Sequence, residues 1–143
     1  RPSRAWHSWL EGHRLRFLGI ATPRPLALIE RRFGPLRAGA WLIVEHCAGP
    51  SLAERPPAAA HPEPVVDLFT RLSAARVSHG DMKASNLLWD GERICLIDLD
   101  AMRQHRDAAS HRRAWRKDRE RFLRNWPADP GLTGALAAAL RDG

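Results

Sequence analysis

The amino-acid sequence predicts an α+β chain in which helices alternate with short hairpins. Two observations support this prediction. Apolar residues recur at helical spacing in several segments, and strand-like apolar runs come in pairs that are separated by turn residues. With 143 residues, of which 44% are hydrophobic, the chain is long enough for one domain with a buried core. No apolar run approaches the ~20 residues that are needed to span a bilayer.

Residues 4–18 form the first predicted helix. Tryptophan, leucine and phenylalanine side chains recur along one face of this segment. Ser3 can cap its first turn, and Gly19 is a good stop signal. The two prolines within residues 21–25 hold the chain extended, because proline restricts both its own backbone and that of the preceding residue.

Two strands are predicted next, at residues 26–30 and 40–45, with a turn region at 33–39 between them. We expect the two strands to pair as a hairpin. A connector with a Gly-Pro pair, residues 46–51, comes after them, and its final serine can cap a short helix that starts near Leu52.

The rest of the chain contains three predicted helices and a second hairpin. The helices span residues 64–76, 107–126 and 131–140, and the long middle helix is rich in arginine. The strands of the hairpin, residues 87–89 and 93–97, are joined by an Asp-Gly pair, which strongly favours a tight turn.

One loop and the strand after it hold the residues that point to chemistry. Asp81 precedes Asn86 by five residues, and Asp98 follows Asn86 by twelve residues at the end of an apolar strand. Phosphoryl transfer from a nucleotide needs a carboxylate that orients the attacking hydroxyl, and an amide and a carboxylate that hold the metal. We therefore predict Asp81 as the catalytic base or orienting group, and Asn86 and Asp98 as Mg²⁺ ligands. Lys83 can neutralise the transferring phosphoryl group.

With these residues, the sequence resembles the protein-kinase-like superfamily and, more narrowly, the lipopolysaccharide kinase (Kdo/WaaP) family of bacteria. The resemblance covers most of residues 5–126 and rests on the segments Leu18–Ala27, His79–Asn86, Ile97–Asp100 and Arg112–Asn125. It implies an enzyme that uses ATP and Mg²⁺ to phosphorylate a sugar hydroxyl of lipopolysaccharide core or a related glycolipid. Aminoglycoside and choline-type phosphotransferases also use a His-Gly-Asp loop, but Lys83 departs from their pattern.

The resemblance also implies how the chain is divided. Residues 1–45 would be the remnant of a kinase N-lobe, residues 46–50 the hinge, and residues 51–143 a mostly helical C-lobe. Kinases need a Gly-rich loop and a strand lysine in the N-lobe. The sequence shows no Gly-rich loop. Neither of its lysines can be the strand lysine, because Lys83 is in the catalytic loop and Lys117 lies beyond it. We therefore expect it to be an N-terminally truncated piece of a longer protein, and to be weakly active alone.

Further roles follow from the same resemblance. Adenine would meet the Glu45 carbonyl and the Cys47 amide, with Val44 at the back of the pocket, although an ordinary loop is the alternative there. Glu11 is the only acid in the first helix that could pair with a strand lysine. We expect His79 to pack and hydrogen-bond beneath the catalytic loop, and not to react itself.

The charge of the chain is concentrated near its C-terminal end. The net charge is +7, and residues 103–124 hold nine Arg or Lys against three Asp or Glu. Such a cluster can bind anionic lipid, and a solvated helix face is the alternative. We expect a cytoplasmic protein that associates peripherally with the inner membrane and does not bind nucleic acid. The residues predicted to meet the membrane are Arg112, Arg113 and Arg116.

Three other expectations concern burial and function class. Trp115, Phe122 and Trp126 should occupy the buried side of the basic helix, with His111 at the surface or at the edge of the core. Two buried, reduced thiols are expected at Cys47 and Cys95, as in cytosolic proteins. A degenerate kinase-like binding module is the non-catalytic alternative, and the complete set of Asp81, Asn86 and Asp98 favours an enzyme.

Overall fold

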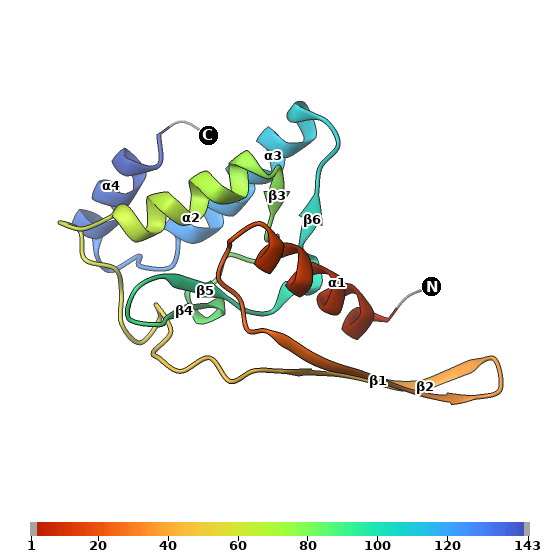
Figure 1. The fold of residues 1–143 in the computed structure, drawn as a ribbon. Coiled ribbons are helices and arrows are strands. Elements are labelled where there is room, and N and C mark those ends of the chain that lie inside the picture. Colours follow the sequence, from red (N-terminus) through yellow and green to blue (C-terminus); the bar gives the residue numbers. More distant parts are fainter. Residues whose placement is uncertain (1–2, 142–143) are drawn as a thin grey trace.

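The computed structural model describes residues 3–141 and shows an α+β fold. A long two-stranded hairpin, β1–β2, and helix α1 lie at one end, whereas helices α2, α3 and α4 gather at the other (Figure 1). The short strands β4 and β5 lie between these two parts. Among the described residues, no helix is both long and apolar enough to cross a membrane.

Helix α1 (Arg4–Phe17) forms as the sequence predicts. The Ser3 side chain accepts a hydrogen bond from the Trp6 amide and caps the first turn. Gly19, with a φ of 71°, takes the left-handed conformation that ends the helix. Gly12 lets α1 approach the hairpin closely, because a Cβ atom there would lie 2.7 Å from Cγ of Pro25.

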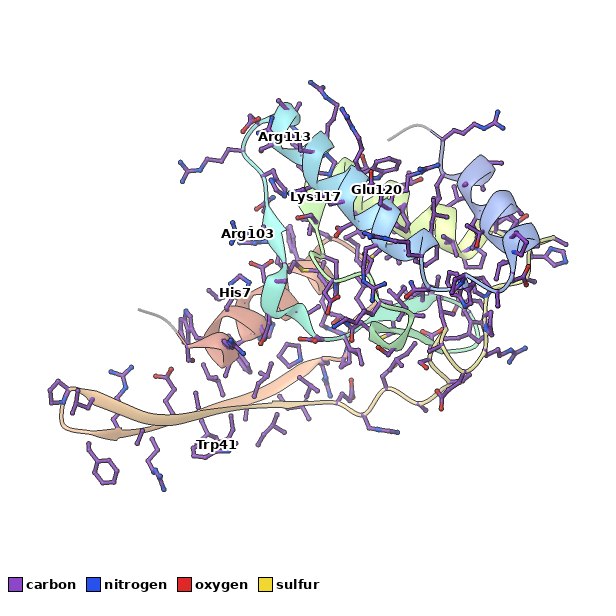
Figure 2. All side chains as sticks on the ribbon, turned by 180° about the vertical axis from the view of Figure 1, so that it is seen from behind. His7, Trp41, Arg103, Arg113, Lys117 and Glu120 are labelled. Atoms are coloured by element: carbon purple, nitrogen blue, oxygen red, sulfur yellow. The ribbon has the colours of Figure 1, made fainter. Side chains whose placement is uncertain are left out.

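The first hairpin consists of β1 (Pro25–Phe33) and β2 (Leu36–Val44), which pair antiparallel. Both strands are longer than predicted, and the expected turn region at 33–39 is wrong. Phe33 pairs directly with Leu36, so that only Gly34 and Pro35 form the turn. The positive φ of Gly34, 56°, makes this tight turn possible. One consequence is an exposed apolar surface, and Trp41 lies on the side of the hairpin away from α1, with its ring beside Gly39 (Figure 2).

The short helix predicted near Leu52 is wrong, because the structure has only a turn there. Ser51 caps this turn as a helix cap would. Its amide donates to Glu54 Oε2 at 2.8 Å, and the Glu54 amide donates to Ser51 Oγ at 3.3 Å. Pro56 and Pro57 follow at once, and prolines at this spacing prevent the turn from continuing as a helix.

In the described part of the chain, the remaining elements are three helices, four short strands and two 3₁₀ turns. In chain order they are α2 (Glu63–Ala74), β3 (Val77–Ser78), the 3₁₀ turn η1 (Ala84–Asn86), β4 (Leu87–Trp89), β5 (Ile94–Leu96), the 3₁₀ turn η2 (Leu99–Ala101), β6 (Arg103–Gln104), α3 (Ala108–Leu123) and α4 (Pro130–Ala139). The predicted β4–β5 hairpin is confirmed. The pairing of β3 with β6 was not predicted, since each strand has two residues.

The core lies where α2, α3 and α4 meet the short strands. Phe122 of α3 is fully buried, and its ring centroid lies 5.4 Å from Phe69 of α2 and 5.2 Å from Trp126. Trp115 packs against the same cluster, half-buried. The predicted apolar side of the basic helix is therefore confirmed.

His111 is buried and not solvated, so the expectation of a surface position is wrong. It is buried beside His105, with the two ring centroids 5.8 Å apart. Burial lowers the pKa of His111, and the charges of His105 and Arg76 lower it further. His111 therefore resists protonation in the folded state.

This burial predicts an acid-sensitive fold. Because the pKa of His111 is lower in the folded state than in the unfolded state, the unfolded state binds more protons and stability falls with the pH. The loss should begin as the pH falls through about 6.5, the usual histidine value. Urea unfolding at about pH 7.5 and about pH 5.5 measures it. His111→Leu should reduce the difference, whereas His61→Gln, an exposed control, should not. An unchanged pH dependence in His111→Leu would contradict this account.

Candidate active site

The loop that carries Asp81 connects β3 to β4, and we call residues 79–86 the Asp-Asn loop. Its first two amides are held by a carboxylate of α3. Asp118 Oδ2 accepts a hydrogen bond from the His79 amide at 2.7 Å, and Asp118 Oδ1 accepts one from the Gly80 amide at 2.9 Å. Asp118 is buried, and this burial raises its pKa, although the two amides act in the opposite direction.

Gly80 is required where the Asp-Asn loop leaves β3. Its φ is 84°, and a Cβ atom there would lie 2.7 Å from the Ala101 carbonyl oxygen. A side chain at this position would therefore be strained and would also clash with the segment that follows Asp98. The glycine of the His-Gly-Asp motif thus lets two segments of the site approach each other.

His79 packs beneath the loop and hydrogen-bonds there, as predicted. It is fully buried, its Nδ1 accepts a hydrogen bond from the Asp81 amide at 3.3 Å, and its Nε2 lies 3.0 Å from the Ile97 carbonyl oxygen. These partners are consistent with the tautomer in which Nε2 carries the proton and donates to Ile97. His79 thus joins the Asp-Asn loop to the residue that precedes Asp98.

Three predicted residues meet within the Asp-Asn loop. Lys83 Nζ lies 2.9 Å from Asp81 Oδ2. Asn86 Nδ2 donates to the same carboxylate oxygen at 3.3 Å and to the Asp81 carbonyl oxygen at 3.0 Å. Both side chains therefore act on Oδ2, and this leaves Oδ1 of the half-buried Asp81 for another partner.

Asp98 is brought close to Asn86 through the backbone. The Ile97 amide donates to the Asn86 carbonyl oxygen at 3.0 Å, directly beyond the last pair of the β4–β5 ladder. Asp98 itself is exposed and left-handed, with a φ of 58°, which is uncommon for a residue other than glycine. This conformation occurs two residues after the end of β5, where the chain turns into η2.

Asp98 lines a cavity of about 380 Å³ between α1, the hairpin and η2. Ser8 and Gly12 face this cavity from α1, and Asp100 faces it from η2. Ser8 Oγ donates to Asp100 Oδ1 at 2.7 Å. Glu11 is not among the residues that line the cavity. Its buried carboxylate lies 2.6 Å from Arg14 NH1 within the same helix.

The three residues predicted to bind adenine are divided between two cavities. Val44 lines the cavity of Asp98, whereas Glu45 and Cys47 line a neighbouring cavity of about 460 Å³. The Glu45 amide donates to the Arg24 carbonyl oxygen at 2.9 Å. Within residues 3–141, the Glu45 carbonyl and the Cys47 amide have no main-chain partner, so both could bind another molecule.

The two cysteines are neighbours in that second cavity, although they are 48 residues apart in the chain. Cys95 is buried as predicted, but Cys47 is only half-buried, so that part of the expectation is wrong. Burial raises the pKa of the Cys95 thiol, and the adjacent Cys47 thiol raises it further. A thiol in this environment is a weak nucleophile at neutral pH.

Comparison with known proteins places this arrangement in a family. The family model of the lipopolysaccharide kinase (Kdo/WaaP) family matches residues 3–142. The chain belongs to this family. The match includes the Asp-Asn loop, Asp98 and the whole of α3, which are the elements that build the site described above. No curated protein sequence matches the chain.

The solved structures support the kinase-like fold of this family member. One structure of WaaP, in complex with acyl carrier protein, is similar with a TM-score of 0.56 and 24% sequence identity. The similarity covers 96% of this chain and 74% of the WaaP chain. The protein is thus a Kdo/WaaP-family chain with a kinase-like fold, and the sequence resemblance is confirmed.

Two residues whose side chains hold the backbone of the Asp-Asn loop were not predicted, Asp118 and Asn125. Basic residues surround Asp118 in the sequence, and this pattern is typical of a charged, exposed helix face. A signal was nevertheless present, because Asp118 follows Trp115 by three residues and precedes Phe122 by four, which places it on the buried face of α3. Asn125 lies just past the C-cap of α3 and contacts Met82 and Ala84.

Asp118→Ala should loosen the Asp-Asn loop and destabilise the fold. The substitution leaves the buried His79 amide without its acceptor, which costs about 1–3 kcal/mol. Urea unfolding measures this change. Asp67→Ala is a matched control, because it removes an exposed carboxylate whose partner Arg71 is also exposed, and it should cost about 0.5 kcal/mol or less. Equal effects of the two substitutions would contradict the anchoring role of Asp118.

Proposed function

We propose that this protein transfers the γ-phosphate of ATP to a sugar hydroxyl of lipopolysaccharide core or a related glycolipid. The observation that carries the proposal is the geometry of Asp81. One of its carboxylate oxygens is shared by Lys83 and Asn86, and the second is left for an acceptor. Membership of a lipopolysaccharide kinase family supports the substrate class.

Asp81 would orient the acceptor hydroxyl and receive its proton. The hydrogen bond from Asn86 Nδ2 to Asp81 Oδ2, at 3.3 Å, and the ion pair of Oδ2 with Lys83 hold this side chain, so that Oδ1 keeps one direction. Lys83 Nζ, 2.9 Å from Oδ2, places a positive charge beside the position that the transferring phosphoryl group would occupy. A preorganised charge of this kind stabilises the transition state more than the ground state.

Asn86 and Asp98 would hold Mg²⁺ on the phosphates. Both hydrogen bonds of the Asn86 side chain use Nδ2, so its carbonyl oxygen Oδ1 is available, and Asp98 supplies an exposed carboxylate. Within residues 3–141, no group of three or more His, Cys, Asp or Glu is placed to hold a metal ion. Two oxygen ligands nevertheless suit Mg²⁺, which keeps several waters and binds phosphate oxygens. When bound, this ion neutralises charge on the phosphates.

The adenine would lie between the two parts of the chain. We propose residues 1–45 as part of an N-lobe, residues 46–50 as the hinge and residues 51–143 as the C-lobe. The unpaired Glu45 carbonyl and Cys47 amide support this division, because an adenine base needs one acceptor and one donor of this kind. Val44 lines the cavity of Asp98 and would stand at the back of the adenine pocket.

Two substitutions separate the proposed roles. Asp81→Asn should lower kcat about 10²–10⁴-fold and leave the affinity for Mg·ATP unchanged, because hydroxyl orientation acts only in the transition state. Asp98→Asn should also weaken Mg²⁺-dependent nucleotide binding, because it removes a charge from the metal site. Phosphate transfer to lipopolysaccharide core and calorimetric titration of nucleotide are the measurements.

Asp67→Asn, on the exposed side of α2, is the control for these two variants and should behave as wild type. If all three substitutions cause the same small loss, the assignment of Asp81 and Asp98 is wrong. If Asp98→Asn lost activity but bound nucleotide as well as wild type, the assignment of Asp98 as a metal ligand would be wrong. The assignment of Asp81 would stand.

The basic face of α3 is proposed to meet the anionic inner membrane. Four of the six basic residues of α3 are exposed, Arg112, Arg113, Arg116 and Lys117, and so is Arg124 at the C-cap. Arg113 and Lys117 lie on the same side of the molecule as Arg103 of β6 (Figure 2). Arg119 does not belong to this exposed set. It donates to the Ala137 and Leu140 carbonyl oxygens and so joins α3 to the end of α4. Each exposed basic residue near such a surface contributes about 1 kcal/mol.

Co-sedimentation with anionic vesicles tests this surface. The triple variant of Arg112, Arg113 and Arg116 to Ala should lose most of the binding, and salt should weaken binding by wild type, since charges are screened beyond ~8 Å at physiological ionic strength. A triple variant of Arg31, Arg55 and Arg93, which are exposed outside α3, carries the same loss of charge and should keep most of it. If both triple variants lost vesicle binding equally, the net charge of the protein, and not the face of α3, would explain the binding.

A further inference from the structure

The side chain of Asn125 brackets Lys83 from outside the Asp-Asn loop. Asn125 Oδ1 accepts a hydrogen bond from the Ala84 amide at 3.0 Å, and Asn125 Nδ2 donates to the Met82 carbonyl oxygen at 3.0 Å. One amide therefore binds the backbone on both sides of Lys83. No other side chain among residues 3–141 hydrogen-bonds to the backbone of Met82 or Ala84.

Asn125 is itself firmly held. It lies directly after Arg124, the C-cap of α3, and both Nδ2 and its own backbone amide donate to the Phe122 carbonyl oxygen, at 2.8 and 3.1 Å. Phe122 is fully buried in the core. The amide plane of Asn125 is thus oriented by the end of a helix, and it transmits that orientation to the loop.

The backbone around Lys83 is fixed on every side. Met82 is fully buried and Ala84 is 5% exposed, so the neighbours of Lys83 are both anchored in the core. The Lys83 amide donates to the Asp81 carbonyl oxygen at 2.8 Å, and the Lys83 carbonyl oxygen accepts from the Asn86 amide at 2.9 Å. Only the exposed side chain of Lys83 leaves this framework, and its Nζ reaches Asp81 Oδ2.

The ion pair cannot hold Lys83 in place by itself. The Lys83 side chain in this pair is 51% exposed. Exposed ion pairs stabilise a fold by only about 0–1 kcal/mol, because solvent screens the charges and the side chains lose entropy. The position of Nζ therefore depends on the direction in which the Lys83 backbone presents the side chain. Among the side chains of residues 3–141, Asn125 is the one that contributes hydrogen bonds to the backbone on both sides of Lys83, and it therefore helps to set that direction.

We infer that Asn125 is a positioning residue for phosphoryl transfer, which acts by aiming Lys83 at the reacting phosphoryl group. This inference rests on the proposed function, in which Lys83 neutralises that group. Asn125 does not touch substrate in this scheme, and its effect on the reaction should pass entirely through Lys83. A purely structural residue would instead lower stability and leave the reaction of the folded protein unchanged.

A double-mutant cycle on the transfer reaction tests the inference. Asn125→Ala in the wild-type background should lower kcat about tenfold or more and change the affinity for Mg·ATP by less than about twofold, since misplacement of a catalytic group has this effect. In the Lys83→Ala background, Asn125→Ala should cause no further loss beyond about twofold, because the two residues act through one interaction. Thr133→Val, which removes a hydrogen bond to Trp126 near the same end of α3, is the control and should leave kcat unchanged.

A second variant covers the case in which Asn125→Ala does not fold. Asn125→Gln keeps the amide and shifts it by one methylene, and it should lower kcat by an intermediate amount that also disappears in the Lys83→Ala background. Losses that simply multiply in the double variant, or an unchanged kcat in a folded Asn125 variant, would overturn the inference while leaving the proposed function intact. A wild-type protein that transfers no phosphate would overturn both.

Discussion

The candidate site depends on the buried carboxylate of Asp118, which accepts the amides of His79 and Gly80. A buried carboxylate is costly, and its pKa is raised here by that burial. The two short hydrogen bonds offset part of this cost, and they fix the point at which the Asp-Asn loop leaves β3. His79, placed in this way, reaches the Ile97 carbonyl oxygen, and Ile97 is the residue before Asp98. Through His79, one carboxylate on a helix thus links the segment of Asp81 to the segment of Asp98.

A second set of contacts ties the segment after Asp98 to the N-terminal part of the chain. Ser8 donates to Asp100, and the ring of His7 lies 2.9 Å from the Met102 carbonyl oxygen. Thr22 Oγ1 donates to the Leu96 carbonyl oxygen at 2.8 Å, just before Asp98. A movement of α1 would therefore displace Asp98. Ser8, and not Glu11, faces the cavity. Helix α1 therefore contacts the segment after Asp98 through the side chains of Ser8 and His7.

Much of this arrangement could be predicted from the sequence, and the exceptions have physical reasons. Local signals were sufficient for α1, for the β4–β5 hairpin and for the spacing of Asp81, Asn86 and Asp98, because periodicity and turn residues act over a few positions. The pairing of β3 with β6 joins two-residue strands that are far apart in the chain, and no local pattern encodes it. Asp118 and Asn125 act through hydrogen bonds to distant backbone, and a single sequence does not reveal such partners.

The most direct test of the account is a crystal structure of the protein with Mg²⁺ and a non-hydrolysable ATP analogue. The account predicts that Asn86 Oδ1 and an Asp98 carboxylate oxygen bind the metal, that Asp81 Oδ1 faces the terminal phosphate across an open space, and that Asp118 keeps its bonds to His79 and Gly80. A nucleotide bound elsewhere, or a metal held without both Asn86 and Asp98, would contradict it.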